Sequence, residues 1–182
     1  SRIPQANWTA MTRLDQNRAI GQIANKAGVA PGEIQNVFVW GNHSPTMVPD
    51  IDSAKVGGKS VRDALDTQWL NEEFDATVRT RGKAIITARG KSSAASAGNA
   101  AIDHIHDWFL GTGSNDFVSM AVPSDGSYGV PEGLIFSFPC RITGPWQYEI
   151  VQGMTIGEGN KERFANTIKE LEDERAAIAE LL

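Results

Sequence analysis

The chain has little that could cross-link it or carry it into a membrane. Cys140 is its only cysteine, so no disulfide can form within the chain, which favours a reducing compartment. No apolar run approaches the roughly 18 residues that a transmembrane helix needs. The first residues, Ser1 to Gln5, lack the apolar stretch of a secretory signal. We therefore expect a cytoplasmic protein without a membrane partner.

An excess of positive charge is also absent. The 17 lysines and arginines stand against 22 aspartates and glutamates, which gives a net charge of −5. This balance argues against a nucleic-acid partner, because such a surface needs a basic face. It leaves room for a small anionic substrate, because one arginine within a site outweighs a weak overall field.

Two kinds of ligand site are not expected. Gly111–Gly113 lacks a third glycine that opens a helix, and Gly157–Gly159 does not follow a strand at the spacing of a dinucleotide-binding motif. His104 and His106 are two residues apart on a predicted helix and point in different directions, whereas metal ligands on one helix face are three or four apart. We expect neither a phosphate cradle nor a metal site in this chain.

The spacing of apolar residues predicts one domain over residues 1–182. Helices are expected over residues 8–28, 67–89 and 92–110 and at the charged C-terminus, and strands over residues 34–40, 117–123, 134–141 and 146–151. This order does not alternate strand and helix, so it predicts the α+β class, with an antiparallel sheet packed by long helices. A stripe of small and apolar residues on the 92–110 helix is expected to pack tightly, against the sheet or a second subunit: Ala94, Gly98, Ala101, Ile102, Ile105 and Phe109.

Three polar residues could carry chemistry. Asp15 and Arg18 are three apart on a predicted helix and share one face. Spacing alone favours a solvated ion pair, worth about 0.3–0.5 kcal/mol. His43 follows a glycine at the end of a predicted buried strand, where loops often hold reactive side chains. A histidine suits proton transfer near neutral pH, and a carboxylate on its second ring nitrogen would fix its tautomer. The alternative is a loop histidine bonded to the backbone.

Ser92 and Ser93 open the alanine-rich helix. Their simplest role is to cap that helix, which either hydroxyl could do. A place in a ligand pocket is compatible with capping.

The pairing of Leu14-Asp15-Gln16-Asn17-Arg18 with Gly41-Asn42-His43-Ser44 resembles malate dehydrogenases of the cytosolic type, within the lactate/malate dehydrogenase superfamily. The resemblance extends over essentially the whole chain. It implies that His43 is the acid/base for the malate hydroxyl, that Asp15 orients His43, and that Arg18 holds a substrate carboxylate in a two-pronged contact. It implies that Ser93, and less clearly Ser92, lines the nicotinamide. Gln16 and Pro45 depart from the usual residues beside these motifs, with no chemical role evidently lost.

The resemblance also implies what lies outside the chain. NAD is the expected cofactor, with NADP as the alternative, and a dicarboxylate is the expected substrate. The dinucleotide-binding N-terminal half of the enzyme is missing here, so we expect the isolated chain to be inactive and to need that half as a partner. A homodimer is also expected. The alternative function is a non-catalytic interaction or dimerisation domain that keeps the dehydrogenase scaffold.

Overall fold

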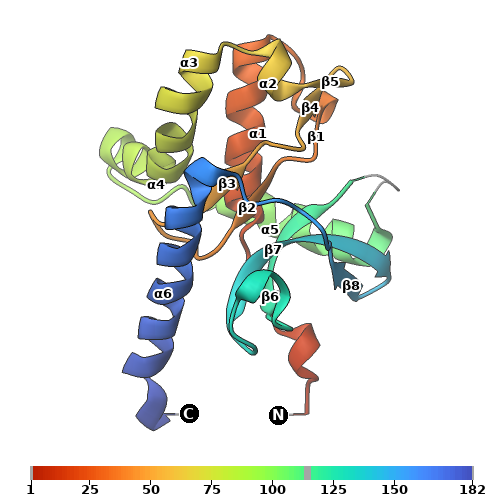
Figure 1. The fold of residues 1–182 in the computed structure, drawn as a ribbon, viewed down its shortest axis with the longest axis vertical. Helices are drawn as coiled ribbons and strands as arrows, with labels where there is room; N and C mark the ends of the chain where they lie inside the picture. The colour runs from red at the N-terminus through yellow and green to blue at the C-terminus, as the bar shows by residue number, and fades with distance from the viewer. Residues whose placement is uncertain (1, 113–115, 182) are drawn as a thin grey trace.

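Figure 1 shows the chain in a computed structural model, which describes residues 2–112 and 116–181. Its helices are α1 (Arg13–Ala27), α2 (Val61–Ala64), α3 (Thr67–Trp69), α4 (Asp75–Arg89), α5 (Ala94–Leu110) and α6 (Lys161–Ala177), with a π-helical turn, η3 (Leu70–Phe74), between α3 and α4. Its strands are β1 (Ile34–Gln35), β2 (Phe38–Trp40), β3 (Val48–Asp50), β4 (Lys55–Val56), β5 (Lys59–Ser60), β6 (Val118–Pro123), β7 (Ile135–Gly144) and β8 (Gln147–Ile150). Gly113, part of the first glycine pair considered above, lies outside the described residues.

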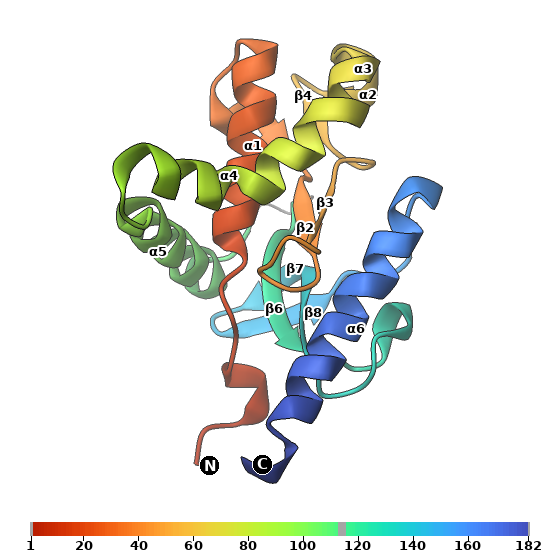
Figure 2. The same cartoon turned by 90° about the vertical axis from the view of Figure 1, so that its left-hand side faces the viewer.

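The strands form antiparallel sheets, which confirms the predicted α+β class. In the described part of the chain these sheets have the strand orders β1–β4–β5, β2–β3 and β6–β7–β8. Figure 2 shows α5 and α6 on opposite sides of the β6–β8 sheet, with α1 beside it. None of the described helices is long and apolar enough to cross a membrane.

Strand β2 joins two hydrophobic clusters. Phe38 and Trp40 pack with the β6–β8 sheet, while the preceding Val37 packs with α1 and the start of α4. All three side chains are at most 1% exposed. The end of β2 is therefore rigid, and the loop that follows it leaves the core between α1 and α6 (Figure 2).

The prediction for the first helix was wrong at its start. Helix α1 begins at Arg13 rather than near residue 8, because Ala10 pairs with Ala121 of β6 through both backbone hydrogen bonds. Its end agrees with the prediction: Gly28 adopts φ 71°, the left-handed conformation in which glycine stops a helix. The extended lead-in sets where α1 enters the fold, and so where its first turn lies.

Helix α5 packs against the β6–β8 sheet, but not through the predicted stripe. The residues of α5 that face the core are Ala100, His104 and Trp108. On the predicted stripe, Ile102 is 68% exposed and Ile105 is 55% exposed. The stripe is thus an exposed apolar face of the single chain. Packing of this face against a second subunit stays a prediction.

Candidate active site

The structure brings Asp15, Arg18 and His43 together. Asp15 lies in the first turn of α1 and is fully buried. Its Oδ2 lies 2.6 Å from Nδ1 of His43, and its Oδ1 lies 3.3 Å from Nη1 of Arg18. The hydrogen bond expected between Asp15 and His43 is therefore present. One buried carboxylate contacts both His43 and Arg18, so the pair on α1 is not the solvated surface pair that spacing alone favours.

His43 reaches Asp15 from the loop after β2. Gly41 opens this loop with φ 94°, and a Cβ there would overlap the side chain of Thr167 on α6. Only glycine fits this turn, for backbone and steric reasons together. The His43 side chain is 51% exposed, with Nδ1 turned to the buried carboxylate. The opposite ring nitrogen, Nε2, is left to meet a ligand.

Asp15 also sets the proton affinity of His43. Its hydrogen bond raises the pKa of His43 above the ordinary value of 6.5, and its negative charge acts in the same direction. Partial burial of the ring and the nearby charge of Arg18 oppose this rise. The imidazole therefore keeps its proton to a higher pH than a free histidine would, with the proton on Nδ1 fixed toward Asp15.

Arg18 is nearly buried, and contacts hold its guanidinium on two sides. Its side chain is 11% exposed, and Nη2 lies 3.4 Å from the hydroxyl oxygen of Ser93 at the start of α5. The guanidinium also passes Gly82 of α4, where an added Cβ would lie 3.6 Å from both Nη atoms. Nε is buried and has no hydrogen-bond partner in the described part of the chain. A buried donor without a partner is unfavourable, so this edge is suited to an anion.

The two serines differ. Ser93 occupies the N-cap position of α5, but its hydroxyl accepts from Arg18 and makes no capping bond. Ser92 is exposed, and its carbonyl oxygen accepts from Arg89. The structure therefore brings Ser93, and not the hydroxyl of Ser92, to the Asp15–His43–Arg18 cluster. Capping by the Ser93 hydroxyl was the simpler interpretation and is wrong.

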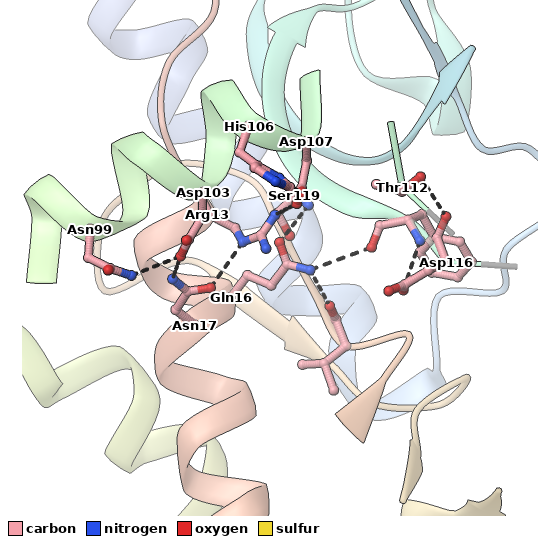
Figure 3. Close-up of polar contacts among 12 residues, drawn as sticks. Arg13, Gln16, Asn17, Asn99, Asp103, His106, Asp107, Thr112, Asp116 and Ser119 are labelled. Carbon is pink, nitrogen blue, oxygen red and sulfur yellow. Dashed lines mark hydrogen bonds and ion pairs between the residues drawn. The ribbon is translucent and has the colours of Figure 1, made fainter. Parts of the chain in front are cut away.

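A polar network on the other side of α1 was not predicted from the sequence. Gln16 is 4% exposed; its Nε2 donates to the Val37 carbonyl, 3.0 Å away, and its Oε1 accepts from the Ser119 amide at 2.9 Å. Figure 3 shows this side chain beside a chain of contacts that joins α1 to α5. In this series of contacts Arg13 of α1 pairs with Asp107 of α5. The departure from the usual motif at position 16 thus has a structural role.

The Asp15–His43–Arg18 cluster lies outside the cleft between β3, η3 and α6. This cleft has a volume of about 430 Å³, with Asp75 and Arg163 among its lining residues. Asp15, Arg18 and His43 do not line it. The chain therefore presents the half-exposed His43 ring, backed by the buried Asp15 and the nearly buried Arg18, on a face that another part of a protein could cover.

The chain is similar to known dehydrogenases in sequence and in fold. The model of the lactate/malate dehydrogenase, alpha/beta C-terminal domain matches residues 12–181. A malate dehydrogenase of Corynebacterium jeikeium (strain K411) is 53% identical over 173 residues, 94% of this chain and 52% of that protein. The malate dehydrogenase structure from Naegleria fowleri is 43% identical with a TM-score of 0.91, covering 99% of this chain and 55% of that one.

A lactate dehydrogenase structure from Trichomonas vaginalis, in complex with NADH and oxamate, is 33% identical. Its TM-score is 0.90, and the match covers 98% of this chain and 56% of that one. The chain spans about half the length of these relatives. By the match over residues 12–181, the chain belongs to the C-terminal domain family of the lactate/malate dehydrogenases.

Proposed function

We propose that this chain is the catalytic and substrate-binding domain of a malate dehydrogenase that interconverts malate and oxaloacetate. The observation that carries the proposal is the shared carboxylate: buried Asp15 holds His43 at 2.6 Å and Arg18 at 3.3 Å. The 53% identity to a malate dehydrogenase supports malate over lactate. A non-catalytic domain on the same scaffold would not need a buried charge shared in this way, because burying it is unfavourable without partners.

Each residue has a chemical role in this proposal. Nε2 of His43 takes the hydroxyl proton of malate, or returns it to oxaloacetate. Asp15 keeps the Nδ1 proton toward itself and stabilises the charged ring. Arg18 uses Nε and the free edge of its guanidinium to bind a substrate carboxylate, which a planar donor set does in a two-pronged way.

A nicotinamide cofactor supplies the hydride acceptor of this reaction. We infer NAD, with NADP as the alternative, because the Trichomonas vaginalis relative was solved with NADH. Ser93 fits a place beside the substrate and the nicotinamide because its hydroxyl contacts Arg18. Ser92 is its exposed neighbour and the weaker candidate. The cofactor phosphates would be bound by a dinucleotide-binding half outside residues 1–182, so the chain alone is expected to be inactive.

We further propose that the protein works as a cytoplasmic homodimer of the cytosolic type. The support is the apolar face of α5: Ile102 is 68% exposed, Ile105 55% and Phe109 46%. Exposed apolar side chains that share one helix face favour association with another surface. Measuring the molar mass of the full-length protein in solution tests the dimer, and fractionation of the source cells tests the location.

An activity assay tests the catalytic assignment. The full-length protein should oxidise malate with NAD, and His43→Gln should lower that rate on the order of 10²–10⁴-fold, the contribution of a positioned acid/base. His106→Gln, an exposed histidine on α5, is the matched control and should leave the rate unchanged.

The raised pKa of His43 predicts how the rates of the two reaction directions change with pH. Oxaloacetate reduction needs protonated His43, so its kcat/KM should fall as pH rises through the raised pKa of His43, above 6.5. Malate oxidation needs the neutral ring and should gain over the same range. A full-length protein without malate turnover, or a His43→Gln variant as active as the native protein, would refute the assignment.

A further inference from the structure

The loop that carries His43 is held by a helix distant in sequence. Gly41 pairs with Ser137 of β7 on one side. On the other side the amide of Asn42 donates to Oγ1 of Thr167 on α6, at 2.9 Å. Thr167 is fully buried, so this contact lies at the closely packed crossing where a Cβ on Gly41 would not fit. The start of the loop is thus fixed against the middle of α6.

One carboxylate then ties the rest of the loop to α6. Oε2 of Glu170 accepts from the Ser44 hydroxyl at 2.5 Å, the Thr46 hydroxyl at 2.7 Å and Nδ2 of the Asn42 side chain at 3.1 Å. These donors lie on both sides of His43 in sequence. Hydrogen bonds to a charged group are stronger than neutral ones, and three on one oxygen restrict the loop backbone around the histidine. Burial raises the pKa of Glu170, but these donors outweigh it and lower the pKa, which keeps the group charged.

The other charged groups at the loop do less to fix it. Glu174, one turn further along α6, accepts from Asn42 at 2.8 Å in an exposed contact. Arg79 of α4 donates to the carbonyl of Pro45 in a second exposed contact. Asp15 contacts the His43 ring itself. Among these groups, Glu170 alone bonds to residues on both sides of His43, at Asn42 and at Ser44.

We propose that Glu170 is a positioning residue for His43, which acts by clamping the loop so that the imidazole stays on Asp15. Its catalytic importance rests on the proposed function, whereas its effect on the placement of His43 does not. The competing role is purely structural: Glu170 would dock α6 and leave the histidine unaffected.

The test measures the His43 ring directly. The full-length protein and its Glu170→Gln variant are labelled in histidine, and the ring resonances are followed through a pH titration, with His43 identified by its loss in His43→Gln. Gln keeps the size of Glu170 but loses the charge that holds the loop. The pKa of His43 should then fall toward 6.5, because a loosened loop weakens the bond to Asp15. Glu172→Gln, an exposed change of the same charge on the same helix, should leave that pKa in place.

Steady-state kinetics give the second readout. Glu170→Gln should lower kcat about ten- to a hundredfold, the effect of displacing a reacting group by about 1 Å, while KM changes less than kcat. Glu170→Asp keeps the charge on a shorter stem and should restore part of both kcat and the His43 pKa. If Glu170→Gln does not fold, Ser44→Ala removes the 2.5 Å contact and takes its place.

A folded Glu170→Gln variant with native His43 titration and native kcat would overturn the proposal. A lowered melting temperature with both readouts native would assign Glu170 to the structural role and overturn it equally. If the native full-length protein showed no malate turnover, the proposed function would fail, and the titration alone would still decide whether Glu170 positions His43.

Discussion

The two sides of helix α1 show two different uses of a polar side chain. Gln16 faces the strands, and both ends of its amide are bonded to buried backbone groups. Arg18 faces the candidate site two residues later, and its buried Nε has no partner in the described residues. Polar groups that are fully hydrogen-bonded stabilise a fold, whereas a buried donor without a partner can still gain a hydrogen bond from a ligand. The difference separates the structural face of α1 from the functional one.

A substitution at Gln16, on the structural face of α1, should cause the largest change in stability. Gln16→Ala leaves the Ser119 amide and the Val37 carbonyl without their partner. It should lower the free energy of unfolding by about 2–6 kcal/mol, since each of the two orphaned buried groups costs about 1–3 kcal/mol. Urea unfolding measures this. Gln22→Ala, the same change at a less buried position of α1, should alter stability by no more than about 0.5 kcal/mol. Equal stabilities for the two variants would contradict the assigned role of Gln16.

A substitution at Arg18, on the functional face of α1, should instead change substrate binding. Arg18→Lys keeps the charge beside Asp15 and loses the two-pronged geometry. It should weaken substrate binding in the full-length protein by about 1.5–3 kcal/mol, the range for charged hydrogen bonds. Stability should change by about 0.5 kcal/mol or less. Calorimetric titration with oxaloacetate and the cofactor measures the loss. Arg62→Lys on α2, whose side chain is 47% exposed and whose Nε is bonded to Asp52, is the control, and native affinity in Arg18→Lys would remove Arg18 from the site.

Local patterns in the sequence placed most of the long helices and strands, whereas the Asp15–His43 pair was expected from the family resemblance and not from spacing alone. A helix start and a strand end carry recognisable residue types, and Gly28 and Gly41 mark where the backbone turns. The start of α1 could not be read in this way, because the pairing of Ala10 with Ala121 spans more than a hundred residues. The same holds for α5: Ala100, His104 and Trp108 face the core because of what packs on them, although other residues of α5 are more apolar.

The supports of the site were hidden for the same reason. Glu170 reads as one charge among many on a solvated terminal helix, and only the fold places it against Ser44. Gln16 carries no pattern of its own, since its partners are backbone groups of distant strands. Motifs identify the groups that do chemistry, while the groups that hold them become visible only with long-range contacts.

The smallest expected effect concerns Gly82, which the sequence marks as a weak point of a long helix. In the structure it lies against the guanidinium of Arg18, with room for one methyl group at an ordinary contact distance of 3.6 Å. Its φ is not in the positive range. Gly82→Ala should therefore raise the free energy of unfolding by about 0.4–1 kcal/mol and leave substrate affinity unchanged. Gly21→Ala on α1, where an added Cβ meets nothing within 4 Å, should give the same gain.

Substitution by a larger side chain should have different effects at Gly82 and at Gly21. Gly82→Leu would push branched carbons into the space that the Arg18 guanidinium occupies, so it should weaken oxaloacetate binding, whereas Gly21→Leu should not. Thermal unfolding and calorimetric titration of the four variants in the full-length protein measure both effects. If Gly82→Leu binds as tightly as Gly21→Leu, Arg18 can move without loss. The packing of α4 would then not hold the anion-binding edge in place, and the functional face of α1 would be defined by Asp15 alone.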